Sequence, residues 1–169
     1  MSEWFPYLTA AVLSDVGCRR ENNEDAAVSL PECGVFAVAD GMGGAAAGEV
    51  ASRFTVEAIR DAFTQSPDAP FALTAEASAR LLVRAVNDAS QAIKVYAAAH
   101  GLAGSGTTVV VLAFDRVTPA RACVLHAGDS RAYRFRDGLL SQLTADHSLA
   151  AAAGVTEEES LPMRFRGVI

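Results

Sequence analysis

The sequence has few cysteines, no long hydrophobic run and an excess of acidic over basic residues. Its three cysteines, Cys18, Cys33 and Cys123, lie far apart, and no two of them form a CxxC pair. A sparse and odd set of cysteines is typical of reduced thiols in a cytoplasmic protein and not of a disulfide framework. We therefore expect free thiols and a cytoplasmic location.

The lack of long apolar runs and of positive charge argues against several further classes. No run is long enough to span a bilayer, and no Lys or Arg precedes the apolar residues at the N-terminus, as a signal peptide requires. The formal net charge of −6 disfavours nucleic acid and anionic membrane surfaces as partners. With 169 residues, 51% of them hydrophobic, residues 1–169 are expected to form a single domain with a sizeable core.

The periodicity of the apolar residues changes twice along the chain. Alternation typical of strands precedes and follows two long segments with helical spacing. Strands are predicted at 8–17, 26–30, 34–39, 106–115, 121–129 and 131–138, and helices at 46–65, at 74–100 and near a Thr-x-x-Glu capping box at 156–159. Two consecutive long helices argue against alternating βαβ units, so we expect an α+β fold with mostly antiparallel strands.

Three of these apolar runs have an acid at one end. Asp40 and Asp129 each end a run, and Glu24 with Asp25 precedes a third. Carboxylates held close together repel one another unless protons or a cation intervene, and hard divalent ions such as magnesium and manganese compensate them with oxygen ligands. Gly41 fits this idea, because a residue without a side chain lets its own carbonyl approach an ion. The spacing alone leaves an equally good alternative, in which Asp40 and Asp129 merely open turns.

Five motifs carry a resemblance to a known family. They are "RRENNEDA", "VFAVADGMGG", "SGTTVVVL", "AGDSRAYRFRDG" and "LTADHSL". In this order they resemble bacterial members of the metal-dependent protein phosphatase family, type 2C, over nearly the whole chain. The resemblance implies an α-β-β-α sandwich of two mostly antiparallel sheets flanked by helices. It also implies two Mn²⁺ or Mg²⁺ ions that activate a water for direct attack on phosphoserine or phosphothreonine.

The resemblance also implies roles for individual residues. Asp40 resembles the carboxylate that bridges the two ions, with the carbonyl of Gly41 on one of them. Glu24 is similar to a ligand of the same ion, directly or through water, with Asp25 supporting it. Arg20 lies four residues before Glu24, where the family has its phosphate-binding arginine, and a guanidinium fork suits that task.

The "GDSR" motif adds a metal ligand and a structural residue. Asp129 resembles the ligand of a third, weaker metal of bacterial members, and Arg131 is interpreted as structural. The chain departs from the family at Ala45, where members usually have a histidine after "DGMGG". We expect this position to shape the loop and not to bind an ion.

A second departure concerns the metal pair itself. The family completes it with two further aspartates, in an Asp-Gly and an Asp-Asn pair, and neither pair is found in the corresponding place before Ile169. We therefore expect a C-terminally incomplete domain, with C-terminal strands missing, from a longer phosphatase. That phosphatase would act on phosphorylated proteins and oppose a cognate Ser/Thr kinase. The alternative is a catalytically inactive phosphatase-like module that binds a kinase or a phosphoprotein.

Two other enzyme classes fit less well. "GMGGAA" at 41–46 matches G-x-G-x-x-A, but a dinucleotide site needs a second strand that ends in an acid about 20 residues later. Residues near Asp61 fall instead in a predicted helix, and Asp40 would repel the phosphates. Ser105 in "AGSGTT" does not match the G-x-S-x-G elbow of serine hydrolases.

The histidines have structural interpretations. His100 is expected to end a helix, where positive charge is mildly favoured. His126 lies within a predicted strand and is expected to be a satisfied core residue. His147 follows Asp146, which could cap a short helix over "SLAAAAG". No histidine is therefore expected among the metal ligands.

Overall fold

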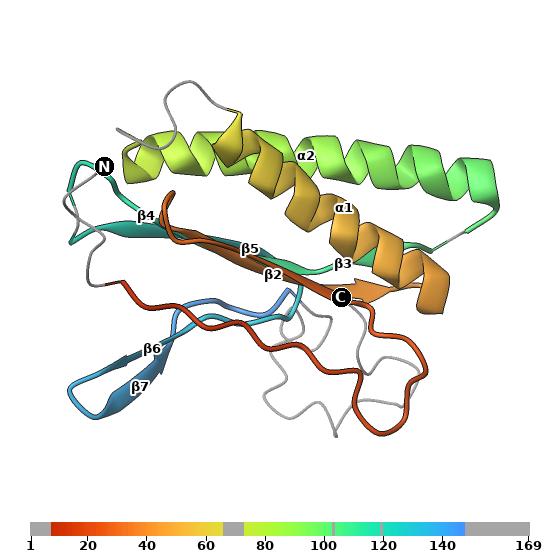
Figure 1. The fold of residues 1–169 in the computed structure, drawn as a ribbon, viewed down its shortest axis with the longest axis horizontal. Helices are drawn as coiled ribbons and strands as arrows, with labels where there is room; N and C mark the ends of the chain where they lie inside the picture. The colour runs from red at the N-terminus through yellow and green to blue at the C-terminus, as the bar shows by residue number, and fades with distance from the viewer. Residues whose placement is uncertain (1–7, 66–72, 103, 119, 148–169) are drawn as a thin grey trace.

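The computed structural model describes residues 8–65, 73–102, 104–118 and 120–147, and at 45–46 the backbone alone. Two helices interrupt a series of short strands (Figure 1). The elements are β1 (Asp25–Leu30), β2 (Val35–Met42), α1 (Ala45–Thr64), α2 (Ala75–His100), β3 (Gly106–Thr107), β4 (Val109–Phe114), β5 (Ala122–Ala127), β6 (Tyr133–Arg136) and β7 (Leu139–Gln142).

Of the described strands, five form one sheet, and β6 and β7 form a separate hairpin. β1, β2, β4 and β5 lie in this order, and β3 pairs with the end of β2. All pairings are antiparallel. Both helices cover the same face of the large sheet (Figure 1). The α+β fold with antiparallel strands is therefore confirmed. Within the described residues helices flank one face only, so the full α-β-β-α sandwich stays a prediction.

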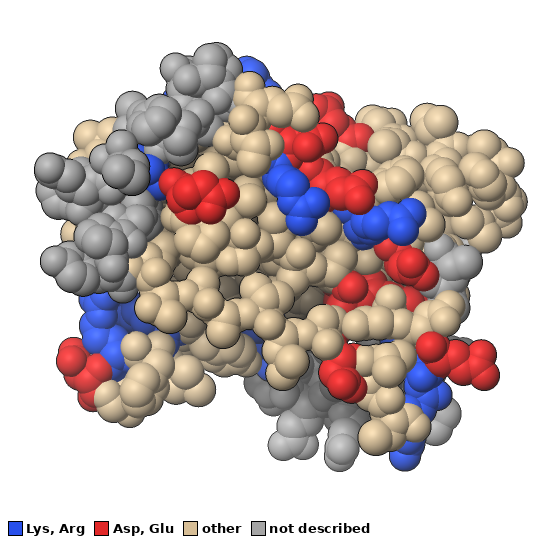
Figure 2. Space-filling view, in the orientation of Figure 1, with Lys and Arg blue, Asp and Glu red and all other residues tan. Residues whose placement is uncertain are grey.

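The surface over α1 mixes charges of both signs. Arg53 lies 3.8 Å from Glu49 and 4.0 Å from Glu57, one helical turn to either side. Figure 2 shows acidic and basic side chains interspersed over this part of the molecule. Exposed pairs of this kind contribute about 0.3–0.5 kcal/mol each.

Of the two described helices, neither combines the length and the apolar character needed to cross a membrane.

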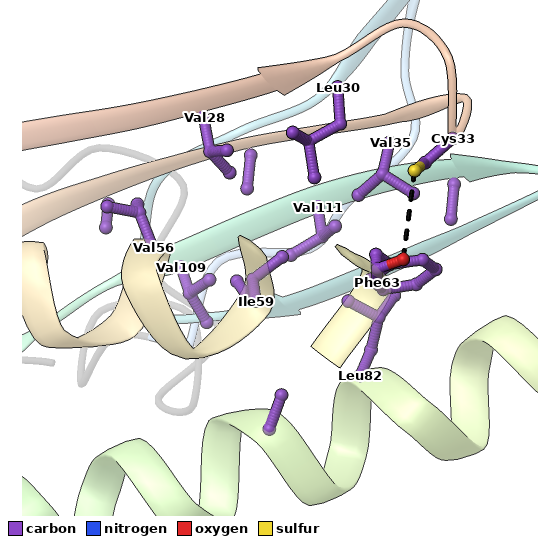
Figure 3. Packing of buried hydrophobic residues seen from close by; sticks show 14 residues of the cluster. Val28, Leu30, Cys33, Val35, Val56, Ile59, Phe63, Leu82, Val109 and Val111 are labelled. Carbon is purple, nitrogen blue, oxygen red and sulfur yellow. Dashed lines mark hydrogen bonds between the residues drawn. The ribbon is translucent and has the colours of Figure 1, made fainter. Parts of the chain in front are cut away.

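The core lies between the helices and the large sheet. Val35 and Val111 of the sheet pack against Ile59 and Phe63 of α1, and Leu82 of α2 completes the cluster (Figure 3). Each of these side chains is at most 1% exposed. Full burial of such a side chain stabilises the fold by about 1.5–3 kcal/mol. The cluster thus fixes α1 on β2, the strand whose end carries the candidate site.

A buried carboxylate ties the end of β4 to the start of α2. Asp115 is 2% exposed and accepts hydrogen bonds from the backbone N–H groups of Ala75, Val117 and Thr118 at 2.9, 2.8 and 2.7 Å. These bonds, that from Ala75 foremost, hold the pKa of Asp115 below its usual value. The carboxylate therefore supports both a turn and a helix start.

The prediction of a strand over 8–17 is wrong. Residues 8–16 have no regular secondary structure, and no described strand pairs with them. Alternating apolar residues alone do not make a strand, because its backbone groups need a hydrogen-bonded neighbour. The segment runs instead along the sheet face opposite the helices (Figure 1) and encloses with it a cavity of about 550 Å³.

Both long helices are confirmed, whereas two predicted strands are divided. The strand over 106–115 is interrupted at Thr108, although β3 and β4 keep one register against β2. The strand over 131–138 is wrong as a single element, because the chain turns at Asp137 and Gly138, with φ of 51° and 78°, and continues as β7. An Asp-Gly pair is a strong hairpin signal.

The helices predicted after residue 147 lie outside the described residues.

Candidate metal and phosphate site

A cavity at the end of β2 brings most of the predicted site residues together. It has a volume of about 280 Å³ and is also lined by Met42, Gly43, Gly44 and Thr108. The predicted residues that line it are Arg20, Glu24, Asp40, Gly41 and Asp129. Asp25 lines a neighbouring cavity of about 210 Å³, and Asp40 lines both. Residues more than 100 positions apart in sequence therefore meet around Asp40.

Two threonines hold the backbone of Asp40. The N–H of Asp40 donates to Thr108 Oγ1 at 3.1 Å, and the N–H of Thr108 donates to the Asp40 carbonyl at 2.8 Å. Thr107 Oγ1 donates to the same carbonyl at 3.0 Å. Neither threonine was assigned a role from the sequence, because threonine is an ordinary residue in a strand. These hydrogen bonds fix the backbone from which the carboxylate of Asp40 projects.

The acids around Asp40 disfavour its charged form. The pKa of Asp40 is raised, first by partial burial, then by the charge of Asp25 and a hydrogen bond with it, and also by the charge of Asp129. The guanidinium of Arg20 opposes this shift. Asp25 and Asp40 are direct neighbours across β1 and β2. A divalent cation would relieve this repulsion between carboxylates.

Two glycines let α1 pack directly against the site. A Cβ on Gly41 would collide with the backbone of Gly48 in α1 and would lie 2.7 Å from the Glu24 carbonyl oxygen. A Cβ on Gly48 would collide with Glu24 Oε2. From the sequence, Gly41 was expected to let its own carbonyl approach an ion, and this stays a prediction. The packing supplies a separate reason, since bare backbone here brings Glu24 against the first turns of α1.

Arg20 and Glu24 lie close together in the lining of the cavity. Arg20 Nη1 lies 3.8 Å from Glu24 Oε1, and the two side chains are 63% and 11% exposed. The arginine side chain is therefore free to turn toward an anion, whereas Glu24 is enclosed. Gly44, which precedes α1 with φ of 90°, also lines the cavity. The positive end of the helix dipole thus faces the same space.

The "GDSR" turn places Asp129 in the lining of the cavity. A Cβ on Gly128, whose φ is 100°, would lie 2.7 Å from Thr108 Cγ2, so this turn needs glycine for both shape and space. Ser130 Oγ lies 2.6 Å from Thr108 Oγ1. Thr108 therefore joins the backbone of Asp40 to the turn that carries Asp129.

Arg131 has the structural role predicted for it. Its Nε donates to Asp146 Oδ1 at 2.8 Å, and its Nη2 bonds Asp146 Oδ2. This pairing raises the pKa of Arg131 and lowers that of Asp146. Asp146 therefore binds an arginine, and the helix that it was predicted to cap lies outside the described residues.

The histidines and Ser105 do not join the site. His100 ends α2, with Nδ1 2.8 Å from the Tyr96 carbonyl. The imidazole of His126 stacks on that of His147 at 4.4 Å, and within the described residues His126 Nδ1 has no hydrogen-bond partner, so its prediction as a satisfied core residue is wrong. Ser105 Oγ donates to the carbonyl of Leu102.

The dinucleotide alternative is also disfavoured by the fold. Asp61 lies within α1, so no strand ends in an acid at the required distance from the glycines.

The donor set is of the kind that hard cations prefer. Three acidic residues, Glu24, Asp40 and Asp129, are among the residues that line the cavity, and no histidine or cysteine is. Carboxylate oxygens suit Mg²⁺ and Mn²⁺. Within the part of the chain that the structure describes, no three His, Cys, Asp or Glu residues are grouped closely enough to hold an ion. The acids of the cavity are therefore of the kind that such an ion prefers, but the described residues do not by themselves form a metal site.

Comparison with known proteins shows the family of the chain. The family described as "Protein phosphatase 2C" matches residues 19–162. The chain is 36% identical over 157 residues to the serine/threonine protein phosphatase PstP of Mycobacterium tuberculosis, covering 90% of this chain and 28% of that protein. It is 34% identical over 140 residues to the serine/threonine phosphatase stp of Listeria innocua, covering 80% of this chain and 53% of that protein.

The structural comparison gives the same result. The crystal structure of the catalytic domain of PstP in complex with two manganese ions matches with a TM-score of 0.71 and 35% identity, over 88% of this chain and 61% of that one. The chain belongs to the protein phosphatase 2C family. It spans between about a quarter and a half of the length of these two curated relatives.

Proposed function

We propose that this chain carries the phosphate-binding and metal-bridging part of a protein phosphatase that hydrolyses phosphoserine and phosphothreonine. The observation that carries the proposal is the gathering of Arg20 with the carboxylates of Glu24, Asp40 and Asp129 around one cavity. A guanidinium group beside several carboxylates suits a phosphoryl group that is bound next to divalent metal ions. Its substrates would be phosphorylated proteins, and its opponent a cytoplasmic Ser/Thr kinase.

The carboxylates would hold the metal. Asp40, fixed by Thr108, would bridge two Mn²⁺ or Mg²⁺ ions, with Glu24 and the Gly41 carbonyl on one of them and Asp25 in support. Asp129, on the facing turn, would hold a third, weaker ion. Ions bound there would lower the pKa of a coordinated water and neutralise charge on the phosphoryl oxygens.

Arg20 would bind and orient the phosphate. Its guanidinium is largely exposed and only 3.8 Å from Glu24, so it can exchange this weak pair for bidentate contact with phosphoryl oxygens. The N-terminus of α1 at Gly44 adds positive potential on the same side. The phosphoryl group would therefore lie between Arg20 and the carboxylates.

The activity is proposed for the family domain as a whole. Among the described residues no three His, Cys, Asp or Glu side chains are grouped closely enough to hold an ion, so a pair of ions would need further carboxylates. This observation favours a second candidate function, in which the chain binds a phosphoprotein or a kinase without hydrolysis.

One assay separates the two functions. Phosphate release from a phosphothreonine peptide and from para-nitrophenyl phosphate is measured with Mn²⁺ for the wild type, Asp40→Asn and Asp88→Asn. Asp88 is exposed on α2, away from the site. The phosphatase predicts a loss of about 100-fold or more in Asp40→Asn alone. Equal rates in all three proteins would contradict it. No hydrolysis, with peptide binding that Arg20→Ala abolishes, would establish the binding module.

A further inference from the structure

A second cavity lies directly beside the candidate phosphate site. It has a volume of about 260 Å³ and extends between α1, α2 and β3. Met42 lines both this cavity and the phosphate cavity. The side chain of Met42 is 42% exposed and lies over Gly106, where a Cβ would be 3.0 Å from Met42 Cε. Met42 therefore forms a partition between two adjacent spaces.

A third cavity continues in the same direction. It has a volume of about 360 Å³ and is lined by the last turns of α2 and by residues of the connection to β3. Lys94 and Ser105 line both the second and the third cavity. The shared residues place the three spaces side by side in a row, and we call the second and third of them together the α2 trough. It leads from the Arg20 site along the C-terminal half of α2.

The α2 trough is lined by both apolar and hydroxyl side chains. The apolar residues of the second cavity include Val86 and Ile93 of α2 and Val109 of β4. Ser90 of α2 and Thr107 of β3 also line it. A concave space that combines an apolar lining with a few polar groups is typical of binding sites.

Lys94 is the cation of the α2 trough. It is the only lysine in the sequence, it is exposed, and no described carboxylate lies within ion-pair distance of it. Arg53, Arg121 and Arg131, by contrast, each contact an acid. In a chain with a net charge of −6, a cation that has no acidic partner among the described residues and lies in a concave surface attracts an acidic group that the rest of the protein repels.

We propose that the α2 trough binds the chain of a phosphoprotein substrate next to its phosphorylated residue, and that Lys94 selects an acidic side chain there. The inference rests on the proposed function, because the phosphoryl group at Arg20 fixes one end of the peptide. Met42 separates the phosphorylated side chain from its neighbour. The residues beyond follow α2.

Peptide binding tests the proposal without hydrolysis. Fluorescent peptides carry a difluoromethylene phosphonate analogue of phosphothreonine, and a Glu or a Gln is placed at each flanking position in turn. Fluorescence anisotropy gives Kd for the wild type, Lys94→Gln and Lys94→Glu. The matched control is Arg84→Glu, the same charge reversal at an exposed site of α2 that lines none of the three cavities.

For the wild type, the peptide with Glu at one flanking position is expected to bind about two- to fivefold more tightly than the peptide with Gln there. This ratio of affinities is in the range that an exposed ion pair contributes. The ratio should fall to about one in Lys94→Gln, invert in Lys94→Glu and persist in Arg84→Glu. A ratio near one at every position in the wild type, or equal loss of it in Lys94→Glu and Arg84→Glu, would overturn the inference while leaving phosphate-dependent binding intact. Equal affinity for unphosphorylated peptides would instead contradict the proposed function.

Discussion

Asp40 and Thr108 are joined by a reciprocal pair of hydrogen bonds across neighbouring strands. The N–H of Asp40 donates to Thr108 Oγ1 at 3.1 Å, and the N–H of Thr108 donates to the Asp40 carbonyl at 2.8 Å. Thr108 also contacts Ser130 in the turn that carries Asp129. One small side chain thus sets the spacing between two of the acids of the proposed metal site.

Replacing Thr108 by valine keeps the shape of the residue and removes this hydroxyl. Because Thr108 is 3% exposed, the loss leaves the Asp40 N–H and Ser130 without their partner, and the free energy of unfolding should fall by about 1–3 kcal/mol. Urea unfolding measures the change. Thr64→Val, at an exposed position of α1, should change stability by less than about 0.5 kcal/mol. A similar small effect for both variants would contradict the role given to Thr108.

For Gly48→Ala, helix propensity predicts an increase in stability, whereas packing predicts a decrease. An alanine in an exposed helix interior usually stabilises by about 0.5–1 kcal/mol relative to glycine. At Gly48 the new Cβ would collide with Glu24 Oε2 and lie 2.8 Å from the carbonyl carbon of Gly41. Gly48→Ala should therefore destabilise the protein by about 1–3 kcal/mol, as measured by urea unfolding. A rise in stability would show that Glu24 does not pack against α1.

Asp115 should make stability depend on pH in the acid range. Its pKa is lowered in the folded state by three backbone N–H groups, that of Ala75 foremost. The stability that it contributes is therefore complete above the ordinary aspartate pKa of about 3.9 and is lost as pH falls through the lower folded pKa. Melting temperatures are measured from pH 2 to 7. The wild type should melt at a higher temperature than Asp115→Asn, and this difference should become smaller below about pH 4. Asp88→Asn should show no such difference, and a constant difference for Asp115→Asn would contradict the account.

Asp40→Asn should not destabilise the metal-free protein. The raised pKa of Asp40 shows that its charge is disfavoured by partial burial and by Asp25 and Asp129. Removing that charge relieves repulsion, so the melting temperature in a chelator should equal or exceed that of the wild type at pH 7. A clear decrease would mean that Asp40 supports the fold through contacts other than those described.

The pattern of apolar residues predicts the two long helices, but it does not predict which strands pair with one another. Helical spacing of apolar residues predicts α1 and α2, because each buries one face against the sheet. Alternation over 8–17 predicts a strand that is not formed, since pairing depends on a neighbour that the pattern does not reveal. The hairpin of β6 and β7 was missed although Asp137 and Gly138 form its turn.

The sequence motifs indicate the residues of the candidate site, but not the residues that hold them in place. Motif order and strand-end acids indicate Arg20, Glu24, Asp40 and Asp129, and these line one cavity. Thr108 gave no signal, because its role arises from its position opposite Asp40 and not from its chemistry. The packing of Gly48 against Glu24 likewise depends on the fold.

Titration of Mn²⁺ by isothermal calorimetry tests the central claim, that the acids around Asp40 form a cation site. The account predicts measurable binding to the wild type and to Asp88→Asn, and a loss of about tenfold or more in affinity for Asp40→Asn, because a hard divalent ion depends on its carboxylate ligands. Equal affinity of Asp40→Asn and the wild type, or no binding to either, would contradict it.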